Sequence, residues 1–163
     1  ARAWAENVAA VDVPVPVATC FRLWQDREGI PRWMPWIESV KVQEEDERLS
    51  RWLLNYDAFG QSFQFSWVAR NLAALPNQKI HWRSVDGSVG GSMGGALEVR
   101  NKGEVRFYPR AADRCEVKLT ISYEVPEVLL PMSTALTPLV EDILRTDMRR
   151  FVEVAKQEHA GGG

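Results

Sequence analysis

The sequence predicts an α+β fold in which a curved antiparallel sheet wraps around one long C-terminal helix. Apolar residues recur at every second position in successive segments of residues 36–124, a pattern typical of strands with one buried face. From about residue 137 the apolar residues follow a helical period instead. The apolar face of the sheet needs a cover, and the terminal helix is the only element long enough to supply it.

The first elements precede this sheet. Residues 6–13 form an expected first strand, which Pro14 and Pro16 end. The following residues, 17–26, carry apolar side chains at helical spacing and predict a short helix. A second helical turn follows before Pro35.

Six strands of a meander are expected next, at residues 36–43, 48–56, 62–69, 78–85, 104–109 and 114–124. Turn-forming residues at 58–60, 75–77 and 111–113 join pairs of them. Strand parity divides the side chains between a covered and a wet face. We expect burial of Trp52, Phe65, Trp82, Phe107 and Leu119, and exposure of Arg51, Gln64, Arg83 and Lys118.

The last element is predicted from one apolar stripe, formed by Val140, Leu144, Met148, Phe151 and Ala155. Thr137 and Pro138 make a good N-cap and first-turn pair. A start at Ser133, with a kink at Pro138, is the alternative.

The length of 163 residues predicts one domain, residues 1–160, followed by a flexible tail at 161–163. A Gly-rich loop insertion is expected at 86–102. A phosphate cradle would have glycines that lead into a helix, whereas a strand pattern follows here. A mobile lid or a plain insertion is the better interpretation.

Charge and cysteine content exclude several functions. The net charge of −2 gives no general attraction to nucleic acid or to an anionic membrane. The acidic run 44–47 is expected to be a solvated turn. Cys20 and Cys115 have no metal-ligand spacing, so we expect two buried free thiols, with no metal and no cofactor. No apolar run reaches the ~20 residues that span a bilayer, and no signal peptide is evident.

Four stretches, at residues 24–37, 80–84, 103–109 and 119–125, carry a family resemblance. They resemble the polyketide cyclase/dehydrase and lipid-transport group of the START-like (SRPBCC) superfamily, in particular its coenzyme-Q-binding branch of plant and cyanobacterial type. The likeness covers about residues 6–157, and the loop at 86–102 departs from it. The resemblance implies a helix-grip cavity, binding of lipids, isoprenoids, quinones or pigments, and cyclase activity in a few members. It also implies a plastid (stroma or thylakoid) or a cyanobacterial-type cytoplasm.

A ligand site is expected between the sheet and the helix, because large rings on a curved sheet cannot all reach one helix. Ordinary core packing is the competing interpretation for each ring. Residues 33–36 form either a pocket mouth, a docking tip for a membrane or protein, or a contact with the helix end. The candidate ligand-binding residues are Trp33, Met34, Trp36, Trp52, Leu54, Tyr56, Phe63, Phe65, Trp67, Trp82, Phe107, Leu119, Ile121, Tyr123, Leu144 and Met148.

Catalysis has little support in the sequence. By strand parity His81 faces solvent, and His159 lies in the tail. No carboxylate has the apolar parity in the sheet, and the polar groups expected on the inner face are those of Tyr56, Ser84, Cys115 and Tyr123. We therefore predict a non-catalytic carrier, chaperone or sensor for a hydrophobic small molecule. An interaction subunit docked through the Trp-rich turn on a membrane complex, such as a photosynthetic one, is the alternative. A cyclase or dehydratase ranks third, and an acid inside the pocket would favour it.

Overall fold

The computed structural model describes residues 4–58, 60–85, 90–91, 100–125, 130–131 and 133–162. The side chains of residues 56, 58, 61, 63, 90, 91 and 133 lie outside that description. The strands are β1 (Trp4–Val13), β2 (Ile37–Val42), β3 (Leu49–Ala58), β4 (Gln61–Asn71), β5 (Lys79–Ser84), β6 (Gly90–Gly91), β7 (Asn101–Ala111) and β8 (Arg114–Glu124). The helices are α1 (Val17–Gln25), the 3-10 helix η1 (Arg27–Arg32) and α2 (Ser133–Gly161).

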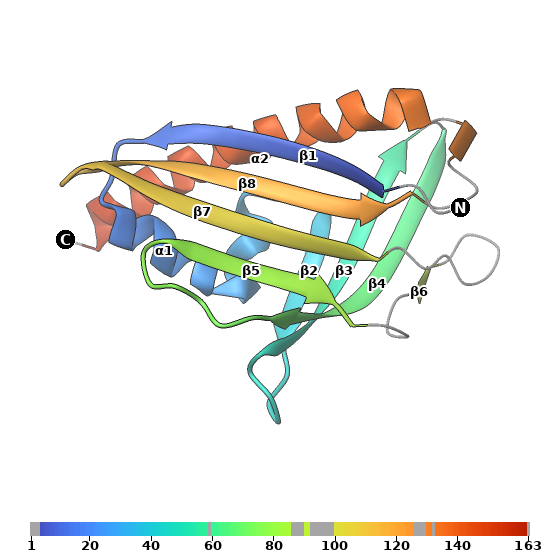
Figure 1. The fold of residues 1–163 in the computed structure, drawn as a ribbon, viewed down its shortest axis with the longest axis horizontal. Helices are drawn as coiled ribbons and strands as arrows, with labels where there is room; N and C mark the ends of the chain where they lie inside the picture. Colours follow the sequence, from blue (N-terminus) through green and yellow to red (C-terminus); the bar gives the residue numbers. More distant parts are fainter. Residues whose placement is uncertain are drawn as a thin grey trace.

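The described strands form one antiparallel sheet in the order β1-β8-β7-β5-β4-β3-β2, and β6 pairs with β4 away from this path (Figure 1). The predicted six-strand meander is confirmed, and β1 extends it by pairing with β8. The strand β7 begins at Asn101, so the end that we expected for the loop at 86–102 is wrong. Residues 86–89 and 92–99 of that loop lie outside the described residues.

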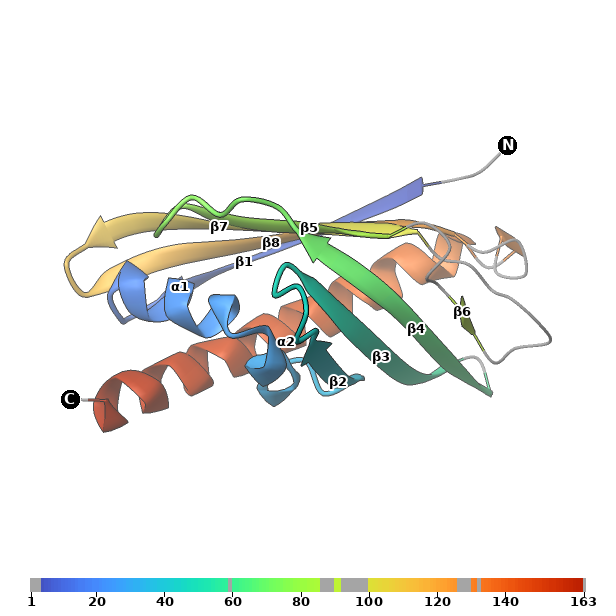
Figure 2. The same ribbon diagram turned by 90° about the horizontal axis from the view of Figure 1, so that it is seen from below.

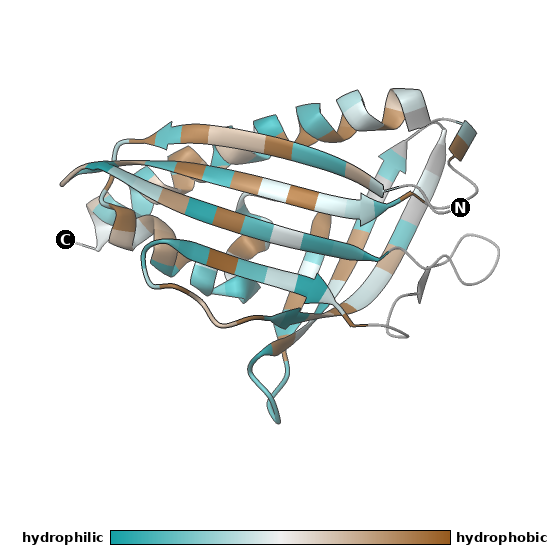
Figure 3. Ribbon diagram, viewed as in Figure 1, coloured by the Kyte–Doolittle hydropathy of each residue, from teal (hydrophilic) through white to brown (hydrophobic). Residues whose placement is uncertain are grey.

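The sheet curves around α2, which runs along one of its faces, with α1 and η1 on the same side (Figure 2). Hydropathy alternates along the long strands, as strand parity requires (Figure 3). Trp52, Trp82, Phe107 and Leu119 are buried as predicted, whereas Phe65 is half-buried. On the other face Arg51, Gln64 and Arg83 are exposed and Lys118 is half-buried. The predicted division of the two faces therefore holds, with these two intermediate positions.

The helix α2 begins at Ser133 and contains Pro138, so the start at Thr137 is wrong and the alternative start at Ser133 is confirmed. Proline has no backbone N–H, so Pro138 cannot donate the helical hydrogen bond to the carbonyl of residue 134. The side chain of Asn7 in β1 donates to the carbonyl of Thr137, 3.0 Å away, and ties this turn of the helix to the sheet. Tertiary contact thus supports a helix that continues through its proline.

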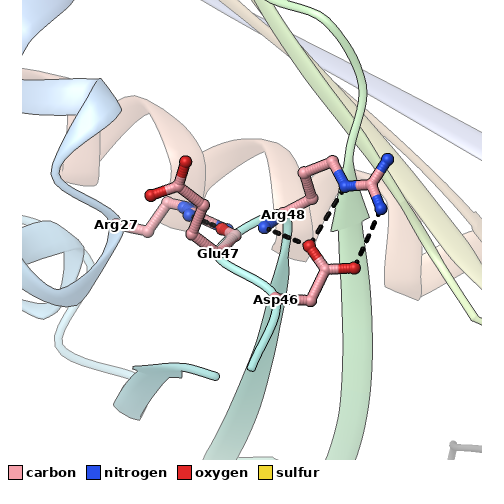
Figure 4. A network of polar contacts seen from close by, with 4 residues as sticks. All are labelled: Arg27, Asp46, Glu47 and Arg48. Atoms are coloured by element: carbon pink, nitrogen blue, oxygen red, sulfur yellow. Dashed lines mark hydrogen bonds and ion pairs between the residues drawn. The ribbon is translucent and has the colours of Figure 1, made fainter. Parts of the chain in front are cut away.

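The acidic run at 44–47 is a turn between β2 and β3, as expected, but it is anchored rather than merely solvated (Figure 4). Asp46 accepts from Nε, Nη2 and the backbone N–H of Arg48, each at 3.0 Å. Arg27 of η1 donates to the carbonyl of Glu47. These contacts fasten the hairpin to the helical layer.

The segment between η1 and β2 is packed into the core. Trp33 and Met34 are 0% and 2% exposed. Trp33 lies edge-on to Trp24 and Phe151, with ring centroids 5.1 and 5.0 Å away. Packing against the helix end is therefore the correct interpretation for these two residues, and an exposed docking tip formed by Trp33 and Met34 is wrong.

Candidate functional site

A groove of about 630 Å³ opens between α2 and the end of the sheet at β2–β3. Its volume falls within the ~300–1,000 Å³ of small-molecule sites. The strand-side lining consists of Pro35, Trp36, Asn55 and Asp57, and the helix-side lining of Leu139, Asp142, Ile143, Thr146, Asp147 and Arg150. The lining mixes apolar walls with several charges, whereas we expected no carboxylate on the inner face of the sheet.

Polar residues of β3 line this groove beyond the ladder that β3 forms with β2. The ladder between β2 and β3 begins where Ile37 lies opposite Leu54. One residue further along β3, the backbone N–H of Asn55 donates to the carbonyl of Trp36 at 3.0 Å. No β2 pairing continues toward Asp57 in the part of the chain that the structure describes. Asn55 and Asp57 thus lie on the part of β3 that extends beyond its ladder with β2.

Asp147 is the buried carboxylate of the groove. It is 2% exposed, and its side chain accepts hydrogen bonds from two neighbours. Trp36 Nε1 donates to Oδ2, and Arg150 Nη1 donates to Oδ1 at 3.0 Å. The same Arg150 nitrogen also donates to the carbonyl of Trp33 at 3.1 Å. The cluster therefore joins α2 to the turn that precedes β2.

Burial raises the pKa of Asp147 to about 6, and the hydrogen bonds from Trp36 and Arg150, with the charge of Arg150, limit the rise. Removing a carboxylate from water disfavours its charged form. The group therefore changes its charge within one unit or so of neutral pH. A carboxyl of this kind in a groove is a marker of functional sites.

A stack of indoles forms the floor of the inner face of the sheet. Trp52 lies between Trp67 and Trp82, with both centroid distances 6.0 Å and interplanar angles of 14° and 18°. Gly103 lies opposite Trp82 on β7, and a Cβ there would stand 2.3 Å from the indole ring. The absent side chain leaves room for the ring. Among the described residues, Trp67 Nε1 is one of three buried indole nitrogens without an acceptor, with those of Trp24 and Trp33.

The predicted ligand-binding residues fall into groups. Of these predicted residues, Trp36 alone is among those that line the groove. Leu54, Phe65, Ile121 and Tyr123 are half-buried. The fully packed group comprises Trp33, Met34, Trp52, Trp67, Trp82, Phe107, Leu119, Leu144 and Met148. The side chains of Tyr56 and Phe63 lie outside the described part of the structure, although the two residues pair across β3 and β4.

The polar groups expected to face a ligand are mostly engaged within the protein. The Tyr123 hydroxyl donates to Asn7 Oδ1 at 3.1 Å, and burial raises the pKa of Tyr123. Ser84 Oγ accepts from the backbone N–H of Asn101 at 3.0 Å. Cys115 contacts Cys20 with their Sγ atoms 3.5 Å apart, and both are buried free thiols, as predicted.

Sequence reasoning missed Asn7, Asp147 and the edge residues of β3. Asn7 was read as one more residue of the first strand, yet it is buried and joins β1 to Tyr123 and α2. Asp147 directly precedes Met148 of the apolar stripe. A carboxylate beside such a stripe was the feature of the sequence from which its burial could have been predicted. Glu124, expected on the wet face, is also buried.

Among the described residues, no group of three His, Cys, Asp or Glu side chains is arranged to hold a metal ion. No helix in the described part of the chain is both long and apolar enough to cross a membrane.

Solved structures with the same fold cover nearly the whole chain. A protein of Deinococcus radiodurans is 28% identical, with a TM-score of 0.66 over 98% of this chain and 100% of that one. The Zhui aromatase/cyclase of a Streptomyces species is 20% identical, with a TM-score of 0.71 over 99% of both chains. A START superfamily protein of Mycobacterium smegmatis is 15% identical, with a TM-score of 0.69 over 93% of this chain and 97% of that one. The last two show a shared fold, the helix-grip fold.

Sequence comparison gives the same relationship. An uncharacterized 17.2 kDa protein of Streptomyces lincolnensis is 23% identical over 155 residues, which cover 93% of this chain and 92% of the relative. The model of one family matches residues 13–153, from the end of β1 to the last turns of α2. The chain belongs to the polyketide cyclase / dehydrase and lipid transport family.

Proposed function

We propose that this protein binds a hydrophobic small molecule between the curved sheet and α2, as a carrier, chaperone or sensor. The observation that carries the proposal is the groove of about 630 Å³ between α2 and the β2–β3 edge. The apolar lining residues Pro35, Leu139 and Ile143 support it, since an apolar ligand binds mainly by removing such surface from water. Lipids, isoprenoids and quinones are the candidate ligands.

Tryptophan fluorescence tests the proposal directly, because several of the seven tryptophans lie on the sheet or at the groove. Titration with a naphthoquinone, a farnesyl alcohol and a fatty acid should change the emission saturably for at least one of them. Mass spectrometry of organic extracts from natively purified protein should then identify what the protein carries. Unchanged emission with all three ligands at their solubility limits, and extracts without a bound compound, would contradict the proposal.

A cyclase or dehydratase is the second candidate, and Asp147 is the observation that favours it. This carboxyl is buried at the groove, and its pKa of about 6 suits an acid or base that works near neutral pH. The test is turnover of a poly-β-ketone analogue by the native protein and by Asp147→Asn. Loss of turnover in the variant, with binding retained, would favour the enzyme over the carrier.

Docking on a membrane complex is a weaker proposal, because Trp33 and Met34 offer no exposed surface. Copurification of a stable protein partner, bound at a surface that includes Trp36, would support it.

A further inference from the structure

The groove combines apolar walls with one buried carboxylate, and this combination restricts the chemistry of its ligand. We propose that the groove selects apolar molecules whose polar end is a neutral hydrogen-bond donor, an alcohol in particular, and that Asp147 accepts this hydrogen bond. The inference rests on the proposed function and adds to it the chemical class of the ligand.

The carboxylate of Asp147 has acceptor capacity to spare. An ionised carboxylate offers about four acceptor positions on its two oxygens. The described donors to it are Trp36 Nε1 at Oδ2 and Arg150 Nη1 at Oδ1. A buried carboxylate is stabilised by every further donor, because water reaches it poorly. A ligand hydroxyl in the groove would supply such a donor.

The walls beside Asp147 fit an apolar body. Pro35 and the indole of Trp36 stand on the strand side, and Leu139 and Ile143 stand on the helix side. Leu139 and Ile143 are four residues apart on α2, and Asp147 follows four residues later, so the three lie along one stripe of the helix. An elongated apolar ligand along this stripe would place its polar end at Asp147.

The charges of the groove oppose an acidic ligand. Asp57, Asp142 and Asp147 outnumber Arg150 among the lining residues. Arg150 is already paired with Asp147, and Arg145 pairs with Asp142 at 3.1 Å. Among the described lining residues a ligand carboxylate would therefore meet more negative than positive charge, which costs affinity. A cationic head at Asp147 would in turn lie beside Arg150, so a neutral donor fits best.

The test compares three probes that share a ten-carbon chain: 1-decanol, its methyl ether, which accepts but cannot donate, and decanoate. Binding is followed at pH 8 through the indole N–H resonance of Trp36 in ¹⁵N-labelled protein, assigned with Trp36→Phe. Decanol should bind roughly tenfold tighter than the ether, as a hydrogen bond to a charged group implies. Decanoate should bind weaker than decanol by about tenfold or more.

Asp147→Asn should reduce the preference for decanol over its ether to about twofold and strengthen decanoate binding, because it removes the negative charge. Glu153→Gln, on the exposed face of α2 outside the groove, should leave the preference for decanol over its ether unchanged. If Asp147→Asn does not fold, the wild type provides the same information. Its preference for decanol should fall at pH 5, where Asp147 is protonated while Arg150 on α2 stays charged and faces it.

Equal binding of decanol and its ether by the wild type at pH 8 would overturn the inference, as would an undiminished preference in Asp147→Asn. The proposed function would survive either result, since apolar binding would still be present. If none of the three probes perturbs any tryptophan resonance, apolar binding itself fails.

Discussion

At the scale of single residues, Asp147 is the main departure from an apolar core. Its position next to Met148 of the buried stripe takes it out of water, and two donors from different elements stabilise its charged form only in part. The folded protein therefore holds the proton of Asp147 more tightly than the unfolded chain does. The raised pKa makes Asp147 a point where pH acts on both stability and binding.

The first prediction concerns this linkage. Because the folded pKa lies above the unfolded one, the contribution of Asp147 to stability is greatest below about pH 4 and is lost as pH rises through about 6. The loss amounts to about 1–3 kcal/mol. We expect urea titrations of wild type and Asp147→Asn to show that the difference in unfolding free energy changes by this amount between pH 4 and 7.5. Asp142→Asn controls for removal of one carboxylate, and a pH-independent difference for Asp147→Asn would contradict the prediction.

Gly103 supports a second prediction. A Cβ there would stand 2.3 Å from the ring of Trp82, so Gly103→Ala must displace the indole stack. Such overpacking costs about 1–3 kcal/mol. Gly161→Ala is the matched control, because nothing lies within 4 Å of its Cβ position. Thermal denaturation should show a clearly lower melting temperature for Gly103→Ala and no such decrease for Gly161→Ala. Equal melting temperatures for the two variants would mean that the indole stack shifts without a cost in stability.

At the scale of elements, α2 is both the cover of the sheet and one wall of the groove. Leu144, Met148, Phe151 and Ala155 of its stripe are fully buried. Residues Leu139, Ile143 and Asp147 lie on an adjacent stripe that lines the groove. The same helix thus closes the core with one face and presents the candidate site with the next.

The third prediction distinguishes the two sides of this helix. Leu144→Ala and Phe151→Ala should each destabilise the protein by about 2–5 kcal/mol, because both leave cavities in the core. Arg145→Ala should cost less than about 1 kcal/mol, since its ion pairs with Glu141 and Asp142 are exposed. Similar losses in all three denaturant titrations would show that α2 does not pack by this face.

The strands and helices were largely predictable from the sequence, because each has a strong period of its own. Parity placed Trp52 and Arg51 on opposite faces of β3, as the structure has them. The start of α2 was not settled, because the tie from Asn7 to Thr137 comes from a strand 130 residues away. The groove was not predicted for a similar reason: it forms where α2 meets residues of β3 beyond the ladder with β2, which lie far from α2 in the sequence.

At the scale of the whole molecule, segments from the two halves of the chain meet at one end of the sheet. Cys20 of α1 and Cys115 of β8 meet there with both thiols fully buried. The hydrogen bond with Cys115 and burial raise the pKa of Cys20. Neither thiol is open to a reagent while the core is intact.

The fourth prediction uses these thiols as reporters of global unfolding. Ellman's reagent should react slowly with the native protein, at a rate that rises with denaturant in step with loss of tryptophan emission. Both thiols should react at once in concentrated guanidinium. Fast reaction of one thiol in native buffer would instead reveal local opening of α1 over the sheet.

The pairing of β1 with β8 has a consequence for biosynthesis. Trp4 pairs with Glu124, 120 positions later, and every described partner of β1 lies in β8. At about 5–20 residues per second, the ribosome takes roughly 6–24 s to deliver that partner after β1 is made. During this interval the emerging chain carries an unpaired strand that can pair with other chains. Chaperone demand should therefore be greatest before β8 leaves the exit tunnel. A circular permutant that begins at α1, with a linker joining the native termini so that β1 follows β8 and α2, should need chaperones less.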